Sequence, residues 1–310
     1  MPEQEPEKLI HGLYAAVLAP RRADDSIDEP AFSRLIEFLL GKGVSGFAIN
    51  GATGEFCLTT ASGLKSVFSV LRKTAPQASI LCGVGAAGAT KTIELAKIAA
   101  DEGARALLLP MPFFFPYQQV DLEAFVHSVA GAVTLPILLY NLPDFTTPLD
   151  PETSCRLIRE VPNVIGIKDS GQSLDTLRRL TAEKGPACRM VGNDGMLVGA
   201  LREGVCDGVV SGIAGVLPEL IRAILDAAAS GDTEKLNQVS TSLDELKSQL
   251  APFPIPWGLK WLAEARGILN ATFSQPVAAE RSRQAQQLVA WFRKWQSDLA
   301  RRGSAHIATQ

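Results

Sequence analysis

NVIGIK, residues 163–168, is a short apolar run that ends in a lysine. Its near-continuous hydrophobicity is typical of a β-strand covered on both faces, as in a parallel sheet. Seven further runs have the same character: LYAAVLA (13–19), SGFAIN (45–50), SILCGV (79–84), RALLL (105–109), LPILLYN (135–141), RMVGN (189–193) and DGVVSG (207–212). Together they predict eight buried strands.

Stretches with helical periodicity separate these runs. In PAFSRLIEFLLGKG (30–43) apolar residues recur at intervals of three and four, and Asp28 is placed to cap the start of a helix. TKTIELAKIAADEGA (90–104) shows the same pattern. Strands that alternate with helices in this way predict an α/β protein whose parallel sheet closes into a (β/α)8 or TIM barrel. An open doubly wound sheet is the alternative, but no GxGxxG motif follows the first run.

The alternation stops at about residue 213. Three helical stretches without strands between them then predict a C-terminal helical extension: 216–232, 234–250 and 277–300. PFPIP (252–256) predicts a rigid link within it. The expected organisation is an N-terminal tail over 1–9, the barrel over 10–215, C-terminal helices packed on the barrel over 216–300, and a tail over 301–310.

Composition and charge narrow the class of protein. The chain has 310 residues, 46% of them hydrophobic, and a formal net charge of −3, so nothing predicts binding to nucleic acid or to an anionic membrane surface. No apolar run approaches the ~20 residues that span a bilayer. The start, MPEQEPEKLIHG, is polar and acidic and resembles neither a signal peptide nor a transit peptide, so we expect a cytoplasmic enzyme. Five scattered cysteines without a CxxC pair and three distant histidines give no reason to predict a metal.

In barrels of this kind the active site forms at the carboxyl ends of the strands. Lys168 ends its run there, and Tyr140 ends a neighbouring run. Apolar surroundings disfavour an ammonium group, so such a lysine is a candidate nucleophile that attacks a ketone carbonyl to form an imine. The alternatives are a solvated lysine paired with Asp169 and a tyrosine that only packs in the core.

Several motifs together indicate a family. LYAAVLAP near the start, GATGE (51–55), YNLP (140–143), GIKDS (166–170) and a late PIP stand in this order over roughly residues 10–260. In this combination the chain resembles the pyruvate-dependent class I aldolases of the dihydrodipicolinate synthase and N-acetylneuraminate lyase superfamily. The resemblance implies that Lys168 forms a Schiff base with a 2-keto acid and that Tyr140 relays protons near the imine. It also implies that neither an external cofactor nor a metal is needed, because the protonated imine accepts the electrons.

The glycine-rich turn after the second run has an implied role as well. Its backbone amides suit a carboxylate, although a GxxG turn is by itself a weak signal that also fits a plain βα turn. The resemblance implies that the turn binds the keto-acid carboxylate and that Glu55 anchors the turn. The residues concerned are Gly51, Ala52, Thr53 and Gly54.

Departures from the family pattern restrict the range of expected substrates. The family turn usually carries two hydroxyl residues before Gly-Glu, and here the first is Ala52. Phe114 stands where synthases place a relay tyrosine lent by a neighbouring subunit, and Phe145 where they place an arginine that grips the aldehyde carboxylate. We therefore do not expect the dihydrodipicolinate synthase reaction of lysine biosynthesis. Phe114 and Phe145 are instead candidate apolar substrate contacts, or packing residues.

Three further polar residues are candidate substrate contacts. Asp194 matches a position where sialic-acid lyases hold sugar hydroxyls, but its usual glutamate neighbour is Gly195, so a long polyol chain is poorly held. Ser170 either donates to a substrate hydroxyl or caps the following helix. Ser211 ends the eighth run and completes this set.

The expected function is that of a lyase that cleaves a 2-keto-4-hydroxy (2-keto-3-deoxy) acid into pyruvate and an aldehyde, or joins them. A dehydratase of a keto-deoxy sugar acid that uses the same imine is the nearest alternative. A catalytically silent barrel that binds a keto acid and a barrel that binds a phosphate ligand are more distant ones. The resemblance implies a homo-oligomer, a tetramer or a dimer.

Overall fold

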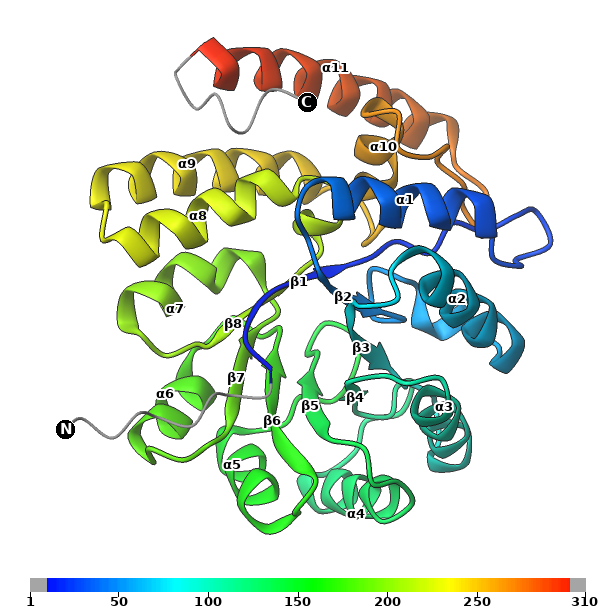
Figure 1. Cartoon of the computed structure of the whole chain (residues 1–310), viewed down its shortest axis with the longest axis vertical. Helices are drawn as coiled ribbons and strands as arrows, with labels where there is room; N and C mark the ends of the chain where they lie inside the picture. The colour runs from blue at the N-terminus through cyan, green and yellow to red at the C-terminus, as the bar shows by residue number, and fades with distance from the viewer. Residues whose placement is uncertain (1–9, 302–310) are drawn as a thin grey trace. The chain divides into compact units, whose positions relative to one another are not determined.

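A computed structural model describes residues 10–301 of the chain, and its strands form a closed barrel in sequence order (Figure 1). The strands are β1 Gly12–Ala16, β2 Gly46–Ile49, β3 Ser79–Gly83, β4 Ala106–Pro110, β5 Ile137–Asn141, β6 Val164–Asp169, β7 Cys188–Val191 and β8 Gly208–Ser211. Neighbouring strands pair in parallel. Each strand overlaps one of the predicted apolar runs, so the (β/α)8 fold class is confirmed.

A helix follows each strand. These helices are α1 Glu29–Gly41, α2 Ala61–Thr74, α3 Ala89–Asp101, α4 Gln119–Ala130, α5 Pro151–Glu160, α6 Asp175–Ala182, α7 Leu197–Glu203 and α8 Pro218–Ser230. Asp28 caps α1 as predicted, because its side chain accepts a hydrogen bond from the Ala31 amide at 3.1 Å. Short 3-10 helices, η1 Phe56–Leu58, η2 Asp194–Met196 and η3 Ile213–Gly215, lie in the loops after β2, β7 and β8.

The C-terminal segment is helical, as predicted, and contains α9 Thr233–Leu250, α10 Trp257–Ala265 and α11 Ala279–Arg301. Helix α8 directly follows β8 and is therefore the eighth helix of the βα pattern. Helix α10 was not predicted; it has only nine residues, no side chain caps its start, and residues 258–263 are all buried. The predicted division after residue 215 stays a prediction. Of the predicted tails over 1–9 and 301–310, residue 301 belongs to α11 and the others lie outside the described residues.

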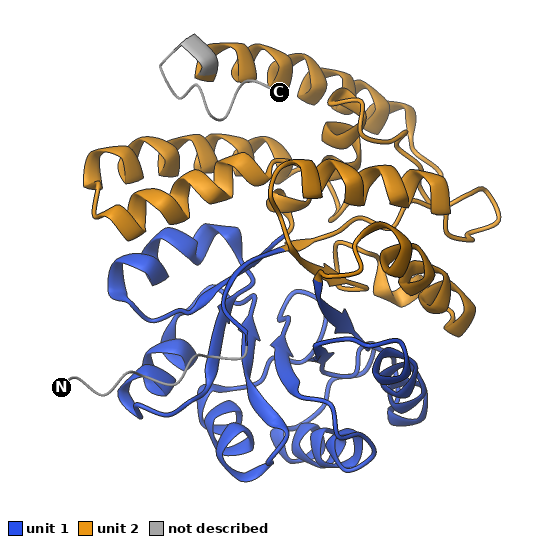
Figure 2. Cartoon of the chain, viewed as in Figure 1, with its two compact units in different colours: residues 1–14, 79–211 blue, residues 15–78, 212–310 orange. Residues whose placement is uncertain are grey.

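The chain divides into two compact units (Figure 2). Of the described residues, unit 1 comprises 10–14 and 79–211, and unit 2 comprises 15–78 and 212–301. In unit 1 the core lies between the sheet β3–β8 and helices α3–α7, where Leu107–109 and residues 137–139 are fully buried. In unit 2 large aromatic side chains fill the core, among them Phe32, Phe47, Phe68 and Phe292.

Residues 10–301 contain neither a helix suited to span a membrane nor a cluster of possible metal ligands. None of the helices in this range is long and apolar enough to cross a membrane. Across the same residues, no group of three or more His, Cys, Asp or Glu side chains is arranged as a metal site. The cytoplasmic location and the homo-oligomer stay predictions.

Candidate active site

Lys168 and Tyr140 face each other at the carboxyl ends of β6 and β5. The two residues are partners in the parallel ladder, and each side chain is only 3% exposed. The Lys168 Nζ atom lies over the tyrosine ring, 3.8 Å from the ring centroid. An amine in this position is removed from bulk water and held against one face of an aromatic ring.

An irregularity between β5 and β6 produces this pairing. Ile137 pairs with Val164, but the next residue, Leu138, pairs with Gly166, so Ile165 is an extra residue in β6. Without this bulge Lys168 would pair with Asn141. Because side chains alternate between the two faces of a strand, the lysine would then lie on the face opposite to Tyr140. The bulge therefore sets the relationship between the two candidate catalytic residues.

Gly192, just after β7, makes room for the lysine. A Cβ atom at this position would lie 2.8 Å from Cε of Lys168 and 2.2 Å from Oγ of Ser170. Both side chains therefore pack against the glycine backbone, and the Gly192 amide donates a hydrogen bond to the Asp169 carbonyl at 2.7 Å. Ser170 thus lies beside Lys168, and its contact with substrate stays a prediction.

A buried polar pair lies on the opposite face of the same two strands. Asn141 and Asp169 are partners in the ladder, and the Asn141 Nδ2 group donates to the Asp169 carboxylate at 3.0 Å. The amide of Gly171 donates to the same carboxylate at 2.8 Å. Burial raises the pKa of Asp169, and these hydrogen bonds partly oppose the rise. Sequence reasoning assigned no role to Asn141, although YNLP contains it.

The two phenylalanines predicted to contact substrate lie on loops. Phe114 follows β4 and is 83% exposed, with a φ of 87° that places it in the left-handed region. Phe145 follows β5 and is 46% exposed. A bridge between Phe113 and Thr146 joins the two loops, so both aromatic rings belong to one pair of loops at the carboxyl end of neighbouring strands.

Asp194 and Ser211 follow β7 and β8. Asp194 begins η2 and is half-buried, and the preceding Asn193 accepts a hydrogen bond from the Gly195 amide at 3.0 Å. Ser211 is the last residue of β8 and is fully buried. Both residues therefore stand at the end of the strands where the site was predicted. Their roles stay predictions.

The glycine-rich turn belongs to unit 2. The Gly54 amide donates to the Gly51 carbonyl, and the Glu55 amide donates to the Ala52 carbonyl, each at 3.0 Å. The Gly54 amide is therefore engaged within the turn, and the predicted substrate contact of Gly54 stays a prediction. Within the described part of the chain, the Gly51, Ala52 and Thr53 amides donate no hydrogen bond. Because backbone N–H groups are normally paired, these three amides and the Thr53 hydroxyl stay candidate donors to a carboxylate.

Glu55 is fixed by a buried lysine. The Lys260 Nζ atom lies 2.6 Å from Glu55 Oε2 and donates to the Thr272 carbonyl at 2.8 Å. Lys260 is 2% exposed, and burial lowers its pKa while Glu55 opposes that shift. The geometry fits an anchoring role for Glu55. The sequence analysis did not select Lys260. The signal that could have found it is a single lysine within the apolar segment of α10.

Enzymes with a (β/α)8 barrel form their active sites at the carboxyl ends of the strands, and this chain buries a lysine there. Residues 9–294 match the Dihydrodipicolinate synthetase family. A 4-hydroxy-tetrahydrodipicolinate synthase of Thermomicrobium roseum is 30% identical over 87% of this chain and 89% of its own length. The chain belongs to the dihydrodipicolinate synthetase family and is a carbon–carbon lyase of that family.

Two solved structures share the fold. Dihydrodipicolinate synthase from Aquifex aeolicus superposes with a TM-score of 0.85 at 23% identity, covering 92% of this chain and 98% of its own. YagE, a prophage protein of the family from E. coli K12 that was solved in complex with pyruvate, superposes with a TM-score of 0.84 at 25% identity, covering 93% and 99%.

Proposed function

We propose that the chain is a Schiff-base-forming lyase that cleaves a 2-keto-4-hydroxy acid into pyruvate and an aldehyde, or joins these two. The observation that carries the proposal is the buried amine of Lys168, held 3.8 Å from the ring centroid of Tyr140 at the carboxyl end of the sheet. The similar barrel YagE was solved with pyruvate, which supports a keto acid as the ligand.

The proposed reaction begins with Lys168. Its neutral amine attacks the C2 carbonyl of the keto acid, and loss of water gives a protonated imine. The amides of Gly51, Ala52 and Thr53 hold the substrate carboxylate, since they are the amides of the turn without another partner in the described chain.

Tyr140 gives its phenolic proton to the hydroxyl that leaves as water when the imine forms, and the resulting phenolate takes the proton from the C4 hydroxyl. The C3–C4 bond then breaks, the aldehyde leaves, and the bonding electrons move into the imine to give an enamine. Protonation at C3 and hydrolysis release pyruvate and restore the amine of Lys168. The contact of the Lys168 amine with the Tyr140 ring supports this role of Tyr140 in proton transfer. The imine supplies the electron sink, so we propose that no cofactor or metal takes part.

We further propose that the substrate is not that of the lysine-pathway synthase. Ala52 and Phe114 lack hydroxyls at two positions of the synthase proton relay, and Phe145 lacks the charge that would hold the carboxylate of the aldehyde. The name of the Thermomicrobium relative describes that protein, which is 30% identical to this chain. An aldehyde with an apolar or uncharged tail fits Phe114 and Phe145 better.

Product analysis tests the proposal. The protein is incubated with a panel of 2-keto-3-deoxy acids, and pyruvate is measured with lactate dehydrogenase and NADH. Release of pyruvate with an equal amount of aldehyde is expected. Loss of water without pyruvate would make the chain a dehydratase, and binding of keto acids without turnover would make it a silent barrel.

The setting of the enzyme is also a proposal. A homo-oligomer, a tetramer or a dimer, in the cytoplasm fits the family. No nucleic acid or membrane partner is proposed.

A further inference from the structure

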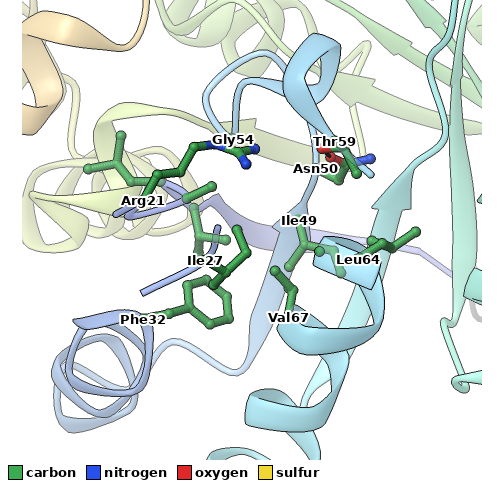
Figure 3. Close-up of a pocket in the computed structure, with 13 residues that line it drawn as sticks. Arg21, Ile27, Phe32, Ile49, Asn50, Gly54, Thr59, Leu64 and Val67 are labelled. Carbon is green, nitrogen blue, oxygen red and sulfur yellow. Dashed lines mark hydrogen bonds between the residues drawn. The ribbon is translucent and has the colours of Figure 1, made fainter. Parts of the chain in front are cut away.

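A small cavity lies inside unit 2, beside the glycine-rich turn (Figure 3). Its volume is about 20 Å³, which is enough for one small ion or one water molecule. Ile27, Phe32, Ile49, Leu64 and Val67 form the apolar part of the wall. Arg21, Asn50, Gly54 and Thr59 line the other end, as Figure 3 shows.

Arg21 is the charged group of this cavity. Its side chain is only 6% exposed, and its Nη1 group donates to the Asp25 carbonyl at 3.0 Å. The Nε–H group is buried and has no hydrogen-bond partner. No carboxylate of the described chain forms an ion pair with this guanidinium. An arginine stays protonated, so it cannot escape burial by losing its charge.

The buried ion pair of Glu55 and Lys260 near Arg21 does not neutralise the Arg21 charge. Glu55 is already paired with Lys260 at 2.6 Å. The charge of Arg21 adds to burial in lowering the pKa of Lys260, so the two cations interact without a second carboxylate between them. The buried cluster of Arg21, Lys260 and Glu55 therefore carries one excess positive charge. Buried charges in proteins are normally paired, and an unpaired one is costly.

We propose that this cavity is a binding site for a small monovalent anion of the halide class, held by the Nε–H group of Arg21. The anion supplies the missing charge and the missing hydrogen-bond acceptor together. The Thr59 hydroxyl is engaged with Asn50, so Arg21 is the main donor.

The position of the cavity gives the anion a structural effect. Arg21 belongs to the loop between β1 and α1, and Gly54 belongs to the turn after β2. An anion that contacts Arg21 therefore stabilises the packing of this loop against the turn. The site is separate from the lyase chemistry and needs no keto acid.

Crystals of the full chain soaked in sodium bromide test the site directly. The expected result is an anomalous bromide peak within hydrogen-bond distance of Arg21 Nε. A peak elsewhere only, or an ordered water in the cavity with no anomalous signal, would overturn the proposal.

Thermal unfolding provides a second test in solution. The wild-type melting temperature is expected to rise by about 2–4 °C in sodium chloride relative to sodium gluconate of equal ionic strength. Arg21→Met is expected to lose this chloride-dependent rise, and Arg22→Met, at the exposed neighbouring arginine, is expected to keep it. Equal melting temperatures of the wild type in the two salts would contradict the proposal. Neither readout needs substrate, so the outcome is independent of the lyase assay.

Discussion

The Lys168 amine lies over the ring of Tyr140, with Nζ 3.8 Å from the ring centroid, because one extra residue in β6 brings the two side chains to the same face of the sheet. The ring contact and the burial of both residues fix where the amine stands. The proposed nucleophile and the proposed proton-transfer group therefore stand on adjacent strands, an arrangement that suits the proposed imine chemistry.

Replacement of Tyr140 by phenylalanine separates the packing of its ring against Lys168 from proton transfer by its hydroxyl. Tyr140→Phe keeps the ring against Lys168 and removes the hydroxyl, so imine formation with pyruvate is expected to persist. Turnover is expected to fall by about 10²–10⁴-fold, the usual loss on removing a positioned proton-transfer group. Steady-state kinetics and borohydride trapping on the same sample measure both. Unchanged turnover would remove Tyr140 from the proton transfer.

Gly192→Ala tests the space that the lysine occupies. The new Cβ would lie 2.8 Å from Lys168 Cε and 2.2 Å from Ser170 Oγ, so the lysine has to move. The rate of imine trapping is expected to fall by roughly tenfold or more, with a loss of about 1–3 kcal/mol in stability from overpacking. Gly185→Ala is the matched control, because a Cβ there meets nothing within 4 Å. Equal trapping rates in the two variants would contradict the description of this site.

Asp169 should make stability depend on pH. Burial raises the pKa of this carboxyl in the folded state, so folding favours its protonated form. The contribution of protonated Asp169 to the free energy of unfolding is fully present below the pKa of about 3.9 in the unfolded chain. It is lost as pH rises through the higher pKa of Asp169 in the folded protein. Asp169→Asn removes the charge and keeps an acceptor for Asn141. The stability of this variant relative to wild type is therefore expected to increase between about pH 4 and 7.

Denaturant unfolding at several pH values measures this difference. Asp144→Asn, at an exposed carboxyl, is the control. A difference between Asp169→Asn and wild type that stays constant over this range would show that burial of Asp169 does not govern the effect.

The fold was predictable from the sequence because each strand is marked by a local pattern of residues. Each of the eight strands is an apolar run, and the position of Lys168 at the end of one such run predicted where its amine would stand. The contact with Tyr140 depends on the bulge at Ile165, which no local pattern of the sequence reveals.

The surroundings of Glu55 and Arg21 and helix α10 were also not predicted, because no local pattern of the sequence reveals them. The pairing of Glu55 with Lys260 joins residues far apart in the chain, and the unpaired charge of Arg21 follows from what is absent around it. Helix α10 has only nine residues and no side-chain cap at its start, so neither its length nor a capping motif marks it in the sequence.

Phe145→Arg tests the proposed preference for uncharged aldehydes. An arginine on this loop is expected to raise kcat/KM for aldehydes that carry a carboxylate by about tenfold relative to uncharged ones, because a charge-assisted hydrogen bond contributes about 1.5–3 kcal/mol. Val120→Arg, at an exposed residue of α4, adds the same charge as a control. The same change of specificity in both variants would exclude Phe145 as a substrate contact.

Borohydride trapping of pyruvate, read by intact mass and peptide mapping, tests the central claim most directly. Wild type is expected to gain one reduced pyruvyl group, mapped to Lys168. Lys168→Ala is expected to gain none while keeping its fold by circular dichroism, and the exposed-lysine control Lys91→Ala is expected to react like wild type. An adduct that persists in Lys168→Ala, or that maps to another lysine in wild type, would contradict the account.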